Sequence, residues 1–265
     1  MYRFLLSRQW VILTLIGLVL MPVMYELGLW QYHRHVHKVA QNALIAGNLN
    51  ADPVPVGKLT SPGHEVPRSD FWRRVEATGT WDTAHETVVR RRTDADDKVG
   101  FHVLTPLRLD DGRYLLVNRG WVDSPARQTD FPKVPPPPSG TVTVTGRLMA
   151  DETTASTGIK DLGGLPDRQV MLINGAQQAK LIGVGQDRLL GGYLEQSGPV
   201  TKSPEQIPPP DSSGIGPHMA YAVQWWLFVA AVPVGWVILV RRELRDRAAA
   251  AARPAADDDR AEVPV

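Results

Sequence analysis

Apolar residues gather in two long runs near the ends of the chain, and a polar segment rich in glycine and proline separates them. The second run, residues 219–240, carries no charged residue. A helix of that length covers roughly 33 Å, enough for a hydrocarbon core of about 30 Å. The first run, residues 10–25, reaches a spanning length once Leu27–Trp30 are added, and no small-residue cleavage site of a signal peptide follows it. The pattern therefore predicts two uncleaved transmembrane helices, at residues 10–30 and 218–240.

The arginines beside these runs predict the orientation of the chain. Arg3 and Arg8 precede the first run, and a basic cluster follows the second: Arg241, Arg242, Arg245 and Arg247. Because positively charged flanks stay on the cytoplasmic side, we expect residues 1–9 and 241–265 in the cytoplasm and residues 31–217 outside. Arg34 and Lys38 favour the opposite orientation, but the four arginines outweigh them.

The first and last residues bear on the compartment. The first span starts at residue 10, which leaves no room for an organelle transit peptide, so we expect a bacterial plasma-membrane protein. From Ala248 the tail is rich in alanine and then acidic, without an apolar period. This composition predicts disorder.

Between the two runs, the patterning is mostly that of β-strands. Residues 100–122 read as a hairpin around Asp110-Asp111-Gly112, and residues 141–149 alternate valine and leucine with threonine. Further strands are predicted at 71–81, 86–93, 169–173 and 189–194, a short helix at 175–182, and a helical continuation of the first span over 31–48. Residues 52–67 and 151–167 read as loops. The fold class is a membrane protein of α+β type, in which two transmembrane helices flank a mostly-β extracytoplasmic domain.

Composition removes several classes of function. The net charge of +1 gives no basic field for nucleic acid. The chain has no cysteine, which excludes disulfides, thiolate metal sites and cysteine catalysis, and disfavours copper delivery. No catalytic motif is present, so we expect no enzyme and no catalytic residue. His33 and His37 have the i, i+4 spacing of metal ligands, although solvated residues at the membrane rim show the same spacing.

A candidate site lies at the outer end of the second span. His218, Tyr221 and Trp225 follow i, i+3, i+7 spacing and share one face of a helix. An aromatic anchor at the membrane–water boundary explains the two aromatic residues. An imidazole at membrane depth is also a candidate functional group, because ionisable residues in membrane spans are rare. Both interpretations are open at this point.

Four segments together are similar to a known family. They are Leu27-Gly28-x-Trp30-Gln31-x-x-Arg34, the stretch 100–122 with VLTPL and LLVNRGWV, Gly146-Arg147-Leu148, and His218-x-x-Tyr221-Ala222-x-Gln224-Trp225. In this order, over roughly residues 10–245, the chain resembles the surfeit locus protein 1 family of cytochrome c oxidase assembly factors.

This resemblance implies a function and a site. The function is assembly of a haem–copper terminal oxidase, by assisting insertion of haem a into the catalytic subunit. Expected partners are the membrane, that catalytic subunit and, as a further candidate, the haem a synthesis machinery. The position of the family's favoured haem-iron ligand is His218, which is also the only metal ligand expected. Tyr221 and Trp225 would lie beside the haem, and Arg34 and Arg119 could bind its propionates, although structural ion pairs are the alternative for both arginines. A rival hypothesis is a scaffold that holds the catalytic subunit without binding haem.

Overall fold

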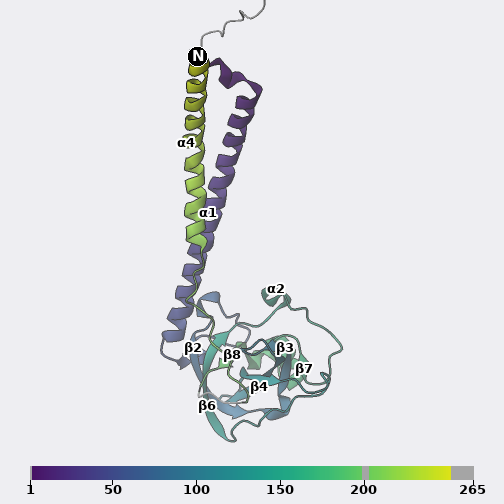
Figure 1. The fold of residues 1–265 in the computed structure, drawn as a ribbon. Coiled ribbons are helices and arrows are strands. Elements are labelled where there is room, and N and C mark those ends of the chain that lie inside the picture. The colour runs from purple at the N-terminus through teal and green to yellow at the C-terminus, as the bar shows by residue number, and fades with distance from the viewer. Residues whose placement is uncertain (1, 199–202, 252–265) are drawn as a thin grey trace, which may run out of the picture. The chain divides into compact units, whose positions relative to one another are not determined.

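The computed structural model describes residues 2–198 and 203–251, which form two compact units. The helical unit comprises residues up to Ala40 and from Gly214, and the sheet unit comprises Gln41–Ser213 (Figure 1). The helices are α1 (Arg8–Asn50), α2 (Thr154–Thr157), α3 (Gly175–Ile182) and α4 (His218–Ala251). The strands are β1 (Val54–Pro55), β2 (Arg74–Trp81), β3 (Thr87–Thr93), β4 (Val99–Leu109), β5 (Tyr114–Asp123), β6 (Thr141–Met149), β7 (Gln169–Val170) and β8 (Leu189–Gln196).

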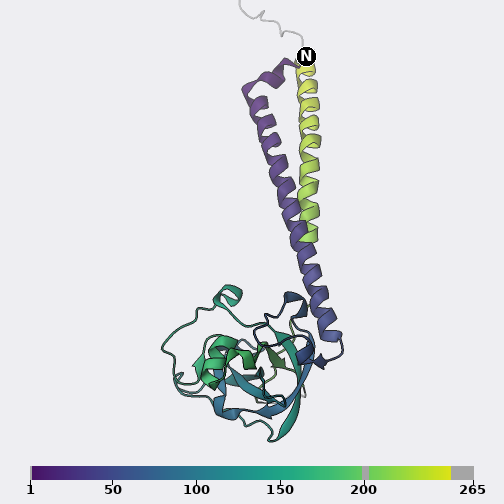
Figure 2. The same ribbon diagram turned by 180° about the vertical axis from the view of Figure 1, so that it is seen from behind.

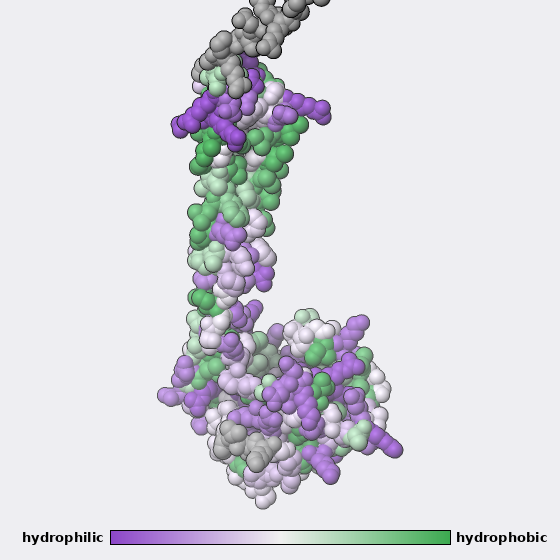
Figure 3. Space-filling model, viewed as in Figure 1, coloured by the Kyte–Doolittle hydropathy of each residue, from purple (hydrophilic) through white to green (hydrophobic). Residues whose placement is uncertain are grey.

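In the helical unit, α1 and α4 lie side by side and run antiparallel (Figures 1 and 2). Their pairing follows one register: the indole Nε1 of Trp236 donates to the Thr14 hydroxyl at 3.0 Å, and Gly28 packs against Trp226. Both helices are long and apolar enough to cross a membrane, and hydrophobic residues cover much of their visible surface (Figure 3). These helices are those of a membrane protein, as the hydrophobic runs predicted.

Both helices extend beyond the predicted spans. The continuation of α1 was expected to Asn48, and the helix ends at Asn50. The prediction of disorder from Ala248 is wrong at its start, because α4 runs to Ala251. Alanine is the strongest helix former, and Arg247 donates to Glu243 one turn earlier at 2.7 Å, so the polar end of the helix has local support. The rest of the predicted disordered tail, 252–265, lies outside the described residues.

The sheet unit contains one sheet of eight strands in the order β1-β2-β6-β8-β5-β4-β3-β7. A further pairing between β2 and β4 closes β2, β6, β8, β5 and β4 into a barrel. Gly79 makes this closure possible, because a Cβ at this position would lie 2.3 Å from the backbone oxygen of Arg108 on β4. Most pairs are antiparallel, but β5 pairs with β8 in parallel. The mostly-β prediction is confirmed.

The hairpin and the alternating strand are found where the sequence placed them. β4 and β5 pair across the Asp110-Asp111-Gly112 turn, in which Gly112 has a φ of +81°. Inside the barrel, Leu115 and Val117 of β5 pack with apolar residues of the other strands, while Leu116 on the opposite face packs against Ile182 and Ala179 of α3. The predicted helix 175–182 is confirmed at both ends, with Asn174 accepting from the Gln177 amide as its N-cap.

Four sheet-unit predictions need correction. The strand expected at 169–173 is only Gln169–Val170, because it pairs in parallel with β3 over two residues before the chain turns into α3. The strand expected from Phe71 begins at Arg74, where pairing with β6 begins. The expected loop at 52–67 contributes the short strand β1, and the loop at 151–167 contains the single turn α2.

Candidate functional site

The imidazole of His218 is held by a residue of the other membrane helix. His218 is the first residue of α4, and its Nδ1 lies 2.9 Å from Oε1 of Gln31 on α1. Because an amide oxygen only accepts, Nδ1–H is the donor, and the neutral imidazole keeps its lone pair on Nε2. This hydrogen bond favours that tautomer of the half-buried ring. This is how proteins commonly orient a histidine whose second nitrogen binds a metal.

Small residues let the two helices approach closely beside this histidine. Gly28 lies one turn before Gln31 and is buried under the indole of Trp226. On α4, Ala222 follows His218 by one turn and is fully buried. Small side chains at a membrane helix interface permit such backbone approach. The stripe of α4 that faces α1 is therefore His218, Ala222 and Trp226, with i, i+4, i+8 spacing.

Tyr221 and Trp225 flank that stripe. The side chain of Tyr221 is 47% exposed, and Trp225 is half-buried with its ring 6.0 Å from that of Phe228 in an edge-to-face contact. Both residues lie on the same side of α4 as His218, as their spacing predicted. An exposed aromatic face beside the imidazole suits an apolar ligand or the membrane interface. Their role in binding stays a prediction.

Arg34 lies on α1, close in sequence to Gln31. Its guanidinium stacks over the indole of Trp30 at 4.9 Å from the ring centroid, and the side chain is exposed. The structural ion pair considered as its alternative role is absent among the described residues. Stacking fixes the plane of the guanidinium and leaves its N–H groups available to an anion.

Arg119, by contrast, is an interior residue of the sheet unit. One of its Nη atoms donates to Glu86 at 2.9 Å and the other to the Pro135 carbonyl at 2.9 Å, while the guanidinium lies 5.7 Å from the Trp81 ring centroid. The Thr105 hydroxyl also donates to Glu86. Burial lowers the pKa of Arg119, and the neighbouring Glu86 partly offsets this effect. Arg119 thus forms a structural ion pair, which was the alternative to propionate binding. Its role in binding stays a prediction.

Among the histidines of α1, the structure singles out one that the spacing did not. His33 and His37 are exposed. His35 lies one turn beyond Gln31 on the same face, and its Nδ1 is buried without a hydrogen-bond partner among the described residues. Within residues 2–198 and 203–251, no group of three or more histidine and carboxylate side chains could hold a metal ion. His35 could be recognised only once the face of α1 that meets α4 was known.

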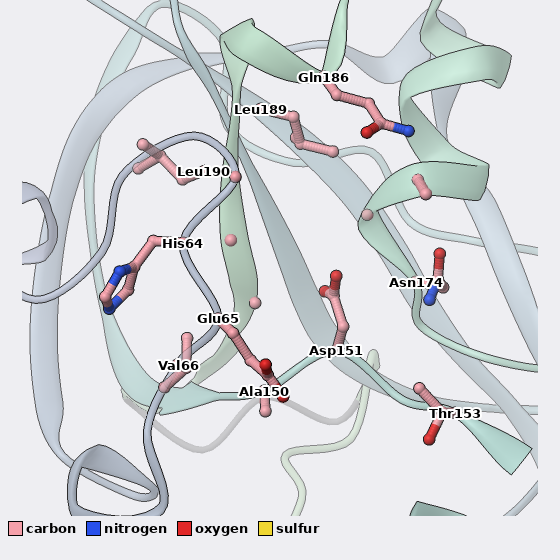
Figure 4. A pocket seen from close by; sticks show the side chains of 15 residues that line it. His64, Glu65, Val66, Ala150, Asp151, Thr153, Asn174, Gln186, Leu189 and Leu190 are labelled. Atoms are coloured by element: carbon pink, nitrogen blue, oxygen red, sulfur yellow. The ribbon is translucent and has the colours of Figure 1, made fainter. Parts of the chain in front are cut away.

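A separate pocket of about 310 Å³ lies in the sheet unit, between the loop at His64 and the start of α3 (Figure 4). Asp151 points into it, and Asn174 lies across from it. Burial raises the pKa of Asp151, although the Gly175 and Gly192 amides lower it in part. No lysine or arginine lines this pocket, and none of the predicted site residues does. It therefore offers no arginine or lysine side chain to a propionate.

Two apolar helices, a closed β-barrel and a histidine fixed at the helix contact define a membrane protein with a folded β-domain and a candidate ligand site in its helix pair. The sequence model of the SURF1 family matches residues 18–230, and the chain belongs to this family. Uncharacterised SURF1-like proteins of Mycobacterium tuberculosis and Mycobacterium bovis are each 31% identical over 247 residues, covering 92% of this chain and 88% of theirs. A SURF1-like protein of Rickettsia bellii is 27% identical over 124 residues, or 43% of either chain. The SURF1 family is linked to cytochrome oxidase assembly and is a family of assembly factors.

Proposed function

We propose that this protein holds haem a during the assembly of a haem–copper terminal oxidase, with Nε2 of His218 as the iron ligand, and assists its insertion into the catalytic subunit. The observation that carries the proposal is the 2.9 Å contact between His218 Nδ1 and Gln31 Oε1. It commits the proton to Nδ1 and leaves the lone pair of Nε2 free to bind a metal.

The surrounding residues fit such a ligand. Bound haem a supplies an iron that accepts neutral imidazole as an axial ligand. The exposed rings of Tyr221 and Trp30 offer apolar surface for a macrocycle. Arg34, stacked on Trp30 and free of ion pairs among the described residues, supplies a charge for a propionate. Gln31 has a positioning role, because it reaches the ligand only through His218.

We also propose that both termini lie in the cytoplasm of a bacterium and that the sheet unit lies outside its plasma membrane. The support is the arginine cluster after residue 240. The chain has no cysteine, so single cysteines introduced at positions 137 and 250 can be labelled with an impermeant maleimide on intact cells. We expect the maleimide to label position 137 alone. Labelling of position 250 alone would show that the chain has the opposite orientation.

The decisive experiment measures haem a bound to the full chain purified from cells that make haem a. Wild-type protein should carry haem a with a Soret band. His218→Ala should remain inserted and folded but lose the haem or shift the Soret band, because it removes the Nε2 ligand. His33→Ala, which removes an exposed imidazole from the same unit, is the matched control and should leave the spectrum unchanged.

A scaffold that holds the catalytic subunit without haem is the rival outcome. Its signature is co-purification of an oxidase subunit with a haem-free wild-type protein, and an equal yield of that subunit with His218→Ala. Wild-type haem content and an unchanged Soret band in His218→Ala would place the ligand elsewhere. Loss of haem a from total cell extracts on deleting the protein would instead indicate a role in haem synthesis.

A further inference from the structure

Three strands of the barrel place two arginines and one glutamate side by side on its outer face. Arg74 on β2 lies directly opposite Arg147 on β6, and Arg147 lies directly opposite Glu195 on β8. The neighbouring residues Val75 and Leu148 point into the barrel core, so the alternation along each strand directs the arginines outward. Directly opposite side chains have Cβ atoms only about 4.5–5.5 Å apart, and like charges at that distance repel.

The single carboxylate of this row is committed to one of the two arginines. Arg147 is 4% exposed, forms an ion pair with Glu195 and donates to the Ile207 carbonyl at 2.8 Å. Its Nε–H is buried and has no hydrogen-bond partner within the described residues. A buried donor without an acceptor is unfavourable, because it has given up its hydrogen bonds to water. The Arg147 guanidinium therefore has an unused donor in a protected position.

Arg74 is half-buried and has no charged partner in the described part of the chain. Glu76, two residues further along the same face, is exposed and forms no ion pair with it. The row thus holds two positive charges and one negative charge. Since a partly buried charge is poorly compensated by solvent, this surplus positive charge favours an anion.

A groove of about 830 Å³ runs along this row. Among the residues that the structure describes, its lining contains Arg74 and Arg147 and no aspartate or glutamate. The other polar lining residues offer hydroxyl and amide donors: Asn50, Thr143, Thr145, Gln196, Ser197 and Gln206. Planar guanidinium groups bind carboxylate and phosphate oxygens well, and hydroxyl and amide donors can complete such a site. The groove has room for an anion that forms one end of a larger molecule.

We propose that this groove binds the oxyanion of a ligand, a carboxylate or a phosphate, through Arg74 and the guanidinium group of Arg147. The site lies wholly within the sheet unit and uses no residue of the His218 site. A test of anion binding is therefore independent of whether the protein binds haem. The oxyanion can come from a soluble molecule or from an anionic lipid headgroup, and the two sources differ in how they can be supplied.

The test uses the full chain in detergent and titrates it with glutarate and with glycerol 3-phosphate, monitored by calorimetry. A second arm compares nanodiscs of phosphatidylcholine with nanodiscs that also contain phosphatidylglycerol. Arg74→Gln removes the unpaired charge and should weaken binding at least tenfold, the effect of about 1.4 kcal/mol. Arg74→Lys keeps the charge without the planar fork and should retain part of the affinity. The matched control is Arg108→Gln, an exposed arginine on β4 outside the groove.

Binding by wild type and Arg108→Gln, lost in Arg74→Gln and weakened by salt, would support the site. A response to the soluble anions identifies a free ligand, and a response to phosphatidylglycerol alone identifies a headgroup. Wild-type protein that binds none of these probes would overturn the proposal. So would an Arg74→Gln variant that binds them as tightly as the control.

Discussion

Gly28→Ala should loosen the helix pair at the point where it fixes His218. An ideal Cβ on Gly28 would lie 2.3 Å from Nε1, 2.6 Å from Cδ1 and 3.0 Å from Cε2 of the Trp226 indole. Carbon atoms in favourable contact lie about 3.5–4.0 Å apart, so the ring or the helix must move by about 1 Å. The ring is also confined by Tyr32, whose centroid lies 6.2 Å away. Overpacking of this kind costs about 1–3 kcal/mol.

Two other glycines of the helix pair calibrate this effect. A Cβ on Gly235 would meet nothing within 4 Å, and one on Gly17 would lie 3.2 Å from Cγ1 of Val232. All three substitutions gain the same helix propensity, about 1 kcal/mol for glycine to alanine, so this gain cancels in the comparison. The stability order should therefore be Gly235→Ala, then Gly17→Ala, then Gly28→Ala. We expect the first and last to differ by about 1–3 kcal/mol.

Unfolding in mixed micelles, followed by tryptophan fluorescence, measures this order. Because Gln31 lies one turn from Gly28, the Gly28→Ala variant should also lose more haem a than Gly235→Ala. A double variant, Gly28→Ala with Trp226→Leu, removes the obstructing ring and should recover part of the lost stability. Equal stability of Gly28→Ala and Gly235→Ala would refute the view that Gly28 sets the helix contact.

Two further predictions concern the sheet unit. Burial, together with the charge of Arg92, lowers the pKa of His102 to about 3, so the folded state keeps this imidazole neutral. Through His102, the free energy of unfolding should fall as pH falls from about 6.5 towards 3, by at most ~1.4 kcal/mol per pH unit. His102→Gln should make the measured slope shallower by that amount, and equal slopes would contradict the prediction. Arg119→Met leaves Glu86 buried without its partner and should cost about 3–5 kcal/mol in denaturant unfolding, most of which Arg119→Met with Glu86→Met should restore. A single variant as stable as wild type would show that the pair is not structural.

The elements that the sequence predicted well are those whose signal is local. An uncharged run of spanning length, an Asp-Gly turn between β-rich segments, and the alternation of Val142 and Val144 with threonines each depend on neighbouring residues alone. The helix at 175–182 has a local cap at Asn174. In these segments, local preference and tertiary packing agree, so the pattern was sufficient.

The closure of the barrel is a different kind of feature. The β2–β4 pairing joins Gly79 to Leu109, and the parallel β5–β8 pairing joins Tyr114 to Leu189. Neither contact has a short-range signature, because strands distant in sequence choose their partners by packing. The burial of Arg147 illustrates the same point. Its position on the strand predicts an outward side chain, yet the segment at Ile207 covers it and leaves it 4% exposed.

For the candidate site, too, the sequence predicted the features with a local signal and missed the contacts between distant residues. Hydropathy and spacing found His218, but no local signal joins it to Gln31, because 187 positions separate the two in sequence. The i, i+4 spacing of His33 and His37 can be seen in the sequence alone, whereas His35 stands out only when the face of α1 that meets α4 is known.

Arg34 and Arg119 looked alike in the sequence, each an arginine inside a matched motif. Their surroundings separate them: the Arg119 guanidinium is already neutralised by a buried carboxylate, whereas that of Arg34 rests on an indole and pairs with no carboxylate of residues 2–198 and 203–251. An arginine with a saturated partner gains little from a propionate, since binding it would require breaking an ion pair that is already desolvated. If either arginine contributes to haem binding, the physical expectation therefore falls on Arg34.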